Sequence, residues 1–293
     1  MKRHVRFCAE GILVLIALVA ALLSQRAFVE DWFRGQSKPE LPKAVTFEDI
    51  KTVEPEGAIV VVPDVVETQP VVEEQVPLPV PPEAGVKSPE PEQTPPPVIL
   101  PDSINLAVPF TPQAPHANWS EPFEETCEEA SLYMVDAFYK GIPEGLISAD
   151  TAEKDLLSIV GFENETFGFY QDTTAQQVST VAELLYGYGH VDLIDNPTVE
   201  DIKTQLVAGR PVLVPTAGRL LGNPNFQQPG PIYHMLVVRG YTAKGQFIVN
   251  DPGTRRGEAY VYDFDTLMNA MHDWNNGDAI EQGEKRAIVI YPN

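Results

Sequence analysis

Residues 125–134, Glu-Thr-Cys-Glu-Glu-Ala-Ser-Leu-Tyr-Met, predict a buried helix that carries a cysteine at its start. Thr126 is a favourable N-cap residue, and Glu129 three positions later completes the pattern of a capping box. The apolar residues that follow recur at near-helical spacing, and Gly141 is a typical stop signal. We therefore expect a helix that begins at Cys127, ends before Gly141 and is buried on much of its surface.

Cys127 is the only cysteine of the part expected to fold, residues 103–293, and a position at the first helical turn suits a nucleophile. The thiolate is the reactive form of cysteine, and the partial positive charge at a helix N-terminus favours it. A lone cysteine in a helix is also commonly a small buried apolar residue. The cysteine by itself leaves both interpretations open.

The rest of the C-terminal part shows helical patterns first and strand patterns afterwards. Helices are expected where apolar residues recur at helical spacing between cap and stop signals. Strands are expected in short apolar runs between turn residues, and the last of them should close the sheet. This order is typical of an α+β fold with two layers around one core. The expected helices span residues 149–160, 174–188, 198–208 and 264–271, and the expected strands span residues 211–215, 234–241, 246–250, 259–262 and 286–291.

A hairpin in this region predicts a base for the thiol. His234 opens an apolar strand, Gly245 supplies the turn, and the paired strand ends at Asn250 and Asp251. Residues 234 and 251 should therefore lie at the same end of the hairpin. A nucleophilic thiol needs a base, and the base needs an orienting acceptor, so Cys127, His234 and Asp251 could form a triad. Each residue also has an ordinary structural interpretation, because strand histidines and Asp-Pro-Gly turns are common.

The N-terminus predicts export and membrane attachment. A basic start, which includes Lys2 and Arg3, precedes an uninterrupted apolar run over residues 11–23. The run is short for a membrane span, which favours a cleaved signal, but no small-residue cleavage site follows it. We therefore expect residues 1–35 to be an uncleaved signal anchor with a single transmembrane helix and with the C-terminal part outside the cell membrane. Secretion after signal cleavage is the alternative.

Residues 36–102 are rich in proline, glutamate and valine and predict a disordered linker. At about 3 Å per residue, such a segment could extend on the order of 150–200 Å. A docking ligand for a proline-binding module is the alternative interpretation. The folded domain is expected over residues 103–293.

Charge and cysteine content exclude several classes of protein. The net charge of −22 argues against nucleic acid as a partner, because a phosphate backbone needs a basic surface. Cys8 and Cys127 are expected in different environments, so no disulfide framework is predicted. No Cys/His cluster has the spacing of zinc ligands, and neither a metal nor a cofactor is expected. The sequence leaves the oligomeric state open.

Four motifs in the domain resemble a known family. They are VPFTPQ (residues 108–113), CEEASL (127–132), HMLVVRGY (234–241) and VNDP (249–252). In this order they resemble the stand-alone relatives of the bacteriocin-processing cysteine peptidases, family thirty-nine, which have a papain-like fold. The resemblance covers residues 107–291. It implies Cys127 as the nucleophile, His234 as the base, Asp251 as the orienting acid and Gln113 as the donor of the oxyanion hole.

The chain departs from the family pattern at two places. The family usually has Cys-Gly-Pro at the nucleophile, whereas this chain has Glu128 and Glu129 after Cys127. Two acids beside the thiol oppose a low thiolate pKa, so that an ion pair with His234 would have to supply it. Gln113 also lies farther upstream of the cysteine, and the insert 114–126 must fold back to bring it to the site.

The resemblance implies peptide hydrolysis through an acyl-enzyme, with a polypeptide as substrate. A cell-wall amidase, a transglutaminase-like acyl transferase and a non-catalytic binding module of the same fold are the alternatives. The long loop 217–231 is the predicted wall of a substrate groove. The expected substrate-binding residues are Trp119, Leu220, Asn223 and Tyr233.

Overall fold

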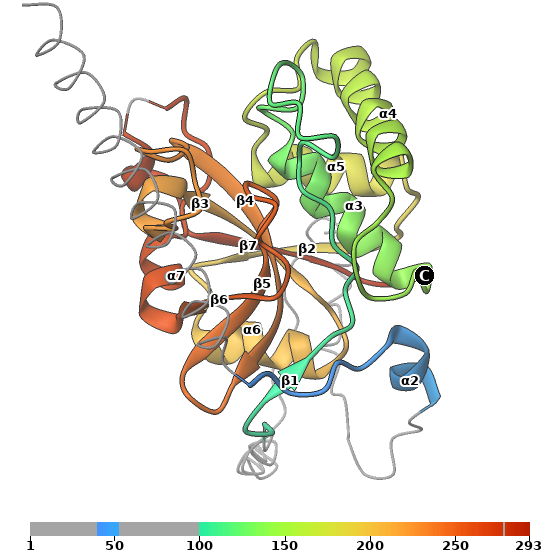
Figure 1. Cartoon of the computed structure of the whole chain (residues 1–293), viewed down its shortest axis with the longest axis vertical. Coiled ribbons are helices and arrows are strands. Elements are labelled where there is room, and N and C mark those ends of the chain that lie inside the picture. The colour runs from blue at the N-terminus through green and yellow to red at the C-terminus, as the bar shows by residue number, and fades with distance from the viewer. Residues whose placement is uncertain (1–39, 53–99, 278) are drawn as a thin grey trace, which may run out of the picture. The chain divides into compact units, whose positions relative to one another are not determined.

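An antiparallel sheet forms the centre of the domain (Figure 1). The computed structural model describes residues 40–52, 100–277 and 279–293, and the account below concerns the unit Lys43–Asn293. In this part of the chain, seven strands pair in the order β2-β7-β3-β4-β5-β6, and β1 pairs with β4. The strands are β1 (Ile104–Asn105), β2 (Val191–Asp195), β3 (Val212–Ala217), β4 (Tyr233–Thr242), β5 (Gln246–Asn250), β6 (Tyr260–Asp263) and β7 (Arg286–Ile290).

The mixed helix and antiparallel-sheet architecture confirms the expected fold class. The prediction that the last strand closes the sheet is wrong, because β7 lies between β2 and β3. Residues 287–290 of β7 are fully buried, which an interior position provides. The strand β2 was not predicted. Its sequence Val-Asp-Leu-Ile-Asp is half-buried or exposed, as befits an edge strand, and its pattern lacks an apolar run.

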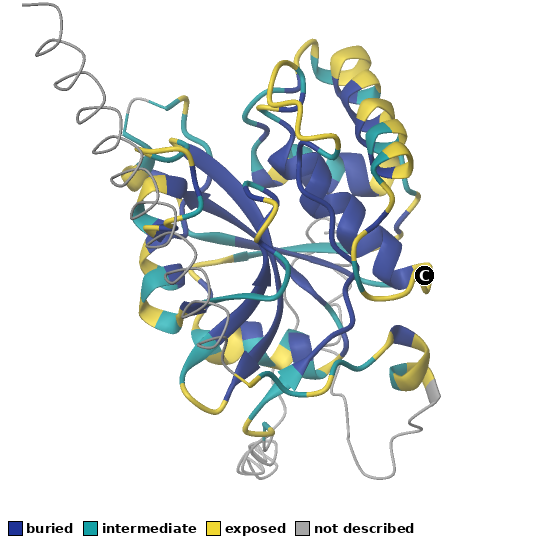
Figure 2. Ribbon diagram, in the orientation of Figure 1, coloured by how far each residue is buried: buried dark blue, intermediate teal, exposed yellow. Residues whose placement is uncertain are grey.

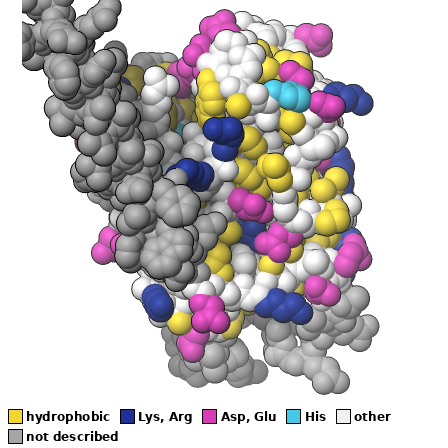
Figure 3. Space-filling view, in the orientation of Figure 1, with side chains coloured by type: hydrophobic (Ala, Val, Ile, Leu, Met, Phe, Trp, Pro, Cys, Tyr) yellow, Lys and Arg dark blue, Asp and Glu magenta, His cyan; other side chains and the backbone are white. Residues whose placement is uncertain are grey.

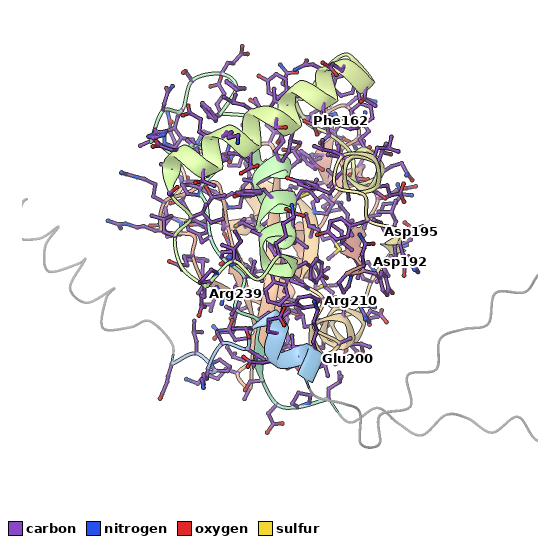
Figure 4. All side chains as sticks on the ribbon, turned by 90° about the vertical axis from the view of Figure 1, so that its right-hand side faces the viewer. Phe162, Asp192, Asp195, Glu200, Arg210 and Arg239 are labelled. Atoms are coloured by element: carbon purple, nitrogen blue, oxygen red, sulfur yellow. The ribbon has the colours of Figure 1, made fainter. Side chains whose placement is uncertain are left out.

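Helices cover more than one side of the sheet. Figure 1 shows α3, α4 and α5 on one side and α7 on the other, so the expectation of two layers is too simple. Figure 4, turned by 90°, shows α4 crossing over α3. The helices are α3 (Cys127–Tyr139), α4 (Ala149–Phe167), α5 (Ala175–Leu184), α6 (Val199–Val207) and α7 (Phe264–Ala270). Helix α4 continues past the predicted end at residue 160 and stops at Gly168, which has φ 84°.

The central helix α3 begins at Cys127, as predicted, and all of its residues are buried (Figure 2). The predicted capping box is wrong. Thr126 makes no side-chain cap hydrogen bond and instead donates from Oγ1 to the carbonyl oxygen of Gln113 at 3.0 Å. Glu129 turns into the interior, with an exposed fraction of 1%. Neither of the two side chains that a capping box needs therefore caps the helix: Thr126 bonds to Gln113, and Glu129 is buried.

A buried arginine attaches the entry segment of the domain to β4. The guanidinium of Arg239 donates from Nε to the carbonyl oxygen of Leu106 at 2.7 Å and from Nη1 to that of Val108 at 3.1 Å. Its Nη2 pairs with the carboxylate of Glu144. Arg239 is labelled in Figure 4 and has no exposed surface. This network positions the segment that leads to Gln113.

A segment upstream of the domain packs on it. The amide of Val45 donates to the carbonyl oxygen of Asn105, and the amide of Ala107 donates to that of Val45, both at 2.8 Å. In the following helix α2 (Phe47–Thr52), the Phe47 ring lies 5.0 Å from the Tyr139 ring of α3. Residues 43–52 were predicted as part of a disordered linker and are instead part of the folded unit.

The remaining N-terminal predictions lie outside the described residues. They are the signal anchor over residues 1–35 and the linker over residues 53–99. Within the ranges that the structure describes, no helix has both the length and the apolar character that a membrane span requires. On the face shown in Figure 3, acidic and basic side chains are interspersed with apolar and neutral ones.

Candidate active site

The structure places His234 beside Asp251, at one end of the β4–β5 hairpin. The imidazole Nε2 lies 2.8 Å from Oδ1 of Asp251, and the exposed fractions of the two side chains are 1% and 0%. His234 is the second residue of β4, and Asp251 directly follows β5. Thr242 pairs with Gln246 across the turn, so the predicted hairpin accounts for this proximity.

Three further groups donate hydrogen bonds to the Asp251 carboxylate. The Tyr262 hydroxyl donates to Oδ2 at 2.7 Å, Asn223 Nδ2 donates to Oδ2 at 3.0 Å, and the Gly253 amide donates to Oδ1 at 3.0 Å. Burial alone would raise the pKa of Asp251, but the charge of His234 and the hydrogen bonds from His234, Tyr262 and Asn223 lower it below its ordinary value. The carboxylate is therefore held in its ionised form.

Tyr262 supports this arrangement from the neighbouring strand β6. Burial, followed by the Asp251 charge, raises the pKa of Tyr262 well above its ordinary value, so that its hydroxyl remains a donor. Asn223 Nδ2 also contacts the Tyr262 hydroxyl, at 2.7 Å. Asn223 was predicted to line a substrate groove, and Tyr262 was not predicted. Asn223 is 1% exposed and contacts Asp251 instead.

Small and aromatic residues hold the His234 ring in place. The ring of Phe226 meets it edge to face at a centroid distance of 5.3 Å. A Cβ atom added at Gly253 would lie 2.8 Å from His234 Cε1, and one added at Gly218 would lie 3.0 Å from the Cβ atom of His234. The loop 217–231 therefore packs against the histidine. Leu220 of this loop is half-buried and remains compatible with the predicted groove wall.

The thiol of Cys127 is buried, with an exposed fraction of 6%. Its Sγ donates to Oε2 of Glu128 at 3.0 Å. Burial, followed by the negative charge of Glu128, raises the pKa of Cys127 well above its ordinary value. The backbone amide of Met235, the residue after His234, lowers this pKa. Among the hydrogen bonds of the described residues, none joins Cys127 to His234 directly. The Met235 amide contacts the sulfur, so the start of β4 lies next to Cys127.

Buried carboxyls surround the start of α3. Glu128, Glu129 and Glu163 each have an exposed fraction of 1%, and Glu163 reaches the group from α4. Burial is the first cause that raises the pKa of each, and the pKa of Glu163 rises to about 8. Both carboxyl oxygens of Glu129 lack a hydrogen-bond partner in the part of the chain that the structure describes. Glu163 was not predicted, since nothing local to α4 marks it.

The insert before α3 folds back and brings Gln113 to the site. The Gln113 amide donates to the carbonyl oxygen of Pro252, next to Asp251, at 2.9 Å. Its side-chain Nε2 donates to the carbonyl oxygens of Phe123 at 3.1 Å and Glu124 at 2.8 Å. Both hydrogens of the predicted oxyanion donor are therefore engaged by the backbone.

The other two expected substrate-binding residues differ in exposure. Trp119 is 40% exposed, in the insert before α3. Tyr233 is 4% exposed, and its hydroxyl donates to the carbonyl oxygen of Thr173 at 3.0 Å. Tyr233 is therefore buried and bonded to the backbone, whereas Trp119 is partly exposed at the surface. The described residues contain no group of three or more His, Cys, Asp or Glu side chains that could hold a metal ion.

Comparison with known proteins identifies the family. The model of the Peptidase_C39 like family matches residues 105–278, which is more than half of the 293 residues. The chain therefore belongs to the Peptidase_C39 like family.

One solved structure is similar to this chain over part of its length. A crystal structure from Bacillus anthracis, provisionally named a C39-like peptidase, is similar to this chain at 15% identity and a TM-score of 0.42. The match covers 65% of this chain and 98% of that one. No curated protein matches the chain.

Proposed function

We propose that this domain is a cysteine peptidase of papain-like fold that hydrolyses peptide bonds through an acyl-enzyme on Cys127. Membership in a peptidase-like family supports a polypeptide substrate. The observation that carries the proposal is the hydrogen bond between His234 Nε2 and Asp251 Oδ1, with a distance of 2.8 Å between the two atoms. It orients the imidazole and leaves Nδ1 for another partner, as a base in a thiol triad requires.

The proposed reaction begins when His234 takes the proton of Cys127. The sulfur then bonds to the peptide carbonyl carbon, and the carbonyl oxygen becomes an oxyanion. When the carbon–nitrogen bond breaks, the leaving amine takes the proton from the His234 imidazolium, which Asp251 stabilises. Water, deprotonated by His234, then attacks the thioester. The carbon–sulfur bond breaks, the product acid leaves, and the thiol is restored.

The oxyanion needs preorganised donors. The backbone amide of Cys127 is one of the free amides of the first turn of α3 and can serve as one donor. The Gln113 side chain is the second candidate, and it must release the carbonyl oxygen of Phe123 or Glu124 to do so.

A thiol-reactive peptide probe on the full chain tests this proposal. Cys127→Ala should abolish labelling at this site, and His234→Ala should slow it about 10²–10⁴-fold, the usual contribution of a general base. His190→Ala is the matched control, because His190 Nε2 also contacts a carboxylate, that of Asp192, at 2.7 Å on the exposed surface. Labelling of His234→Ala at the rate of His190→Ala would contradict the proposed base.

We further propose that residues 1–35 anchor the protein in the cell membrane, with the domain on the outer side. The basic start and the apolar run over residues 11–23 support this placement. Recovery of the full chain in the soluble fraction of lysed cells, with its N-terminus intact, would contradict it.

One observation favours a second candidate, a non-catalytic binding module. Sγ of Cys127 donates to Glu128 rather than to His234. A binding module would leave the probe unreacted and every peptide intact while still retaining a peptide ligand. The same labelling experiment, combined with equilibrium binding of the unreactive parent peptide, therefore separates the two candidates.

A further inference from the structure

The thiol of Cys127 has an acidic partner that the proposed mechanism does not use. Its Sγ donates to Oε2 of Glu128 at 3.0 Å. Glu128 is 1% exposed, and its other oxygen, Oε1, has no hydrogen-bond partner within the described residues. Within the described residues, the Cys127 thiol is therefore the one side-chain hydrogen-bond partner of the Glu128 carboxyl. Cys127 and Glu128, which are adjacent in the first turn of α3, thus form a hydrogen-bonded pair in which the thiol donates and the carboxyl accepts.

The surroundings of this pair are acidic. None of the carboxyls Glu128, Glu129 and Glu163 takes part in an ion pair among the residues that the structure describes. A negative charge on Sγ would lie beside the Glu128 carboxyl in a largely buried site, where charges of like sign are poorly screened. The titratable groups around the pair are Glu129 on α3, Glu163 on α4, Asp172 and Glu125 in the adjoining loops, and Tyr233 on β4.

We propose that Glu128 is a positioning residue that holds Cys127 as an uncharged thiol in the resting site. The S–H bond is directed at Oε2 of Glu128. Reaction then requires the proton to move from Sγ to a ring nitrogen of His234, which breaks the hydrogen bond to Glu128. Glu128 thereby sets how readily the thiolate forms, without contacting the substrate.

The role of Glu128 rests on the proposed function, because it concerns the nucleophile of the proposed peptidase. The experiment that tests it, however, uses no peptide substrate. A failure of the role proposed for Glu128 and a failure of the peptidase proposal are therefore distinguishable. The experiment alkylates the full chain with iodoacetamide between pH 5 and pH 10. Mass spectrometry of the peptide that contains Cys127 follows this thiol separately from Cys8.

The variant Glu128→Gln keeps the shape of the side chain and removes its ionisable carboxyl. It should lower the midpoint of the alkylation profile by at least about one pH unit, which raises the rate near pH 7 about tenfold or more. The matched control is Glu129→Gln, which removes an equally buried carboxyl from the same turn. It should shift the midpoint less, because Glu129 does not contact the sulfur. The limiting rate at high pH should stay similar, which excludes a change in access.

Two outcomes would overturn the inference. One is a Glu128→Gln profile that coincides with that of the wild type or lies at higher pH. The other needs no variant and remains decisive if Glu128→Gln fails to fold. A wild-type midpoint below about pH 7, under the ordinary cysteine value of about 8.5, would mean that the resting site already holds a thiolate.

Discussion

Removal of the Tyr262 hydroxyl provides a sharp test of how Asp251 is held. Tyr262→Phe keeps the ring and deletes the 2.7 Å hydrogen bond to Asp251 Oδ2. It leaves Oδ2 with the single donor Asn223 Nδ2. A hydrogen bond to a charged group contributes about 1.5–3 kcal/mol, and Tyr262 is 4% exposed, so water cannot easily replace the hydroxyl. For a domain of this size, that loss corresponds to a melting temperature lower by about 3–12 °C.

The effect should depend on pH in a defined direction. The pKa of Asp251 in the folded state lies below its ordinary value of 3.8. The stability that ionised Asp251 contributes is therefore fully present above the unfolded-state pKa and is lost as the pH falls through the folded-state pKa. Tyr262→Phe moves the folded-state pKa toward 3.8, the ordinary value. The difference in free energy of unfolding should be constant from pH 6 to pH 8 and shrink below about pH 4.

Urea unfolding of both proteins across this pH range is the measurement. Tyr291→Phe is the control, because its hydroxyl also donates to a carboxylate, Asp192 Oδ2, at 2.8 Å, but in a partly exposed position. Its cost should stay under about 1 kcal/mol, as is usual for exposed polar pairs. If Tyr262→Phe and Tyr291→Phe cost the same, or if the difference persists unchanged at pH 3, the account of Asp251 is wrong.

Two further predictions concern other parts of the domain. Because the pKa of Glu163 is raised to about 8, stability should fall as the pH rises from about 4.5 to about 8. Glu163→Gln should flatten this fall by a few kcal/mol in urea unfolding, whereas the exposed Glu165→Gln should not; an unchanged slope in Glu163→Gln would contradict the shift. Phe47→Ala should release the segment 43–52, because burial of a Phe side chain contributes about 1.5–3 kcal/mol. Hydrogen exchange at the Ala107 amide should then accelerate about 10–100-fold, and unchanged protection would show that Phe47 does not hold the segment.

Local patterns predicted the features that depend on neighbours in sequence. The β4–β5 hairpin follows from two apolar runs around Gly245, and β5 has the predicted bounds. The start of α3 at Cys127 was predicted from Thr126 as the N-cap residue, and Thr126 has this position although the capping box does not form. The meeting of His234 with Asp251 is a direct consequence of hairpin pairing, so no long-range information was needed for that part of the site.

The predictions that were wrong or missing concern features that depend on contacts between residues far apart in the sequence. Thr126 and Glu129 form a typical capping pattern, but the backbone of Gln113 accepts the hydrogen bond of Thr126. Asn223 lies in a loop without regular pattern, and its contact with Asp251 bridges 28 residues. The carboxyl of Glu163 joins the site only because α4 packs on α3. Sequence patterns contain no information on such pairings until the topology is known.

The docking of residues 43–52 on the domain changes the length of the tether. The predicted linker of residues 36–102 was expected to extend on the order of 150–200 Å. With Val45 paired between Asn105 and Ala107, residues 53–99 connect two points that are both attached to the domain. Residues 53–99 therefore do not lengthen the connection between the proposed anchor and the folded unit. Eight residue steps separate residue 35, where the proposed anchor ends, from Lys43, and they span at most about 28 Å. Under the proposed anchoring, the folded unit would therefore begin within this distance of the end of the anchor and not at the end of a long linker.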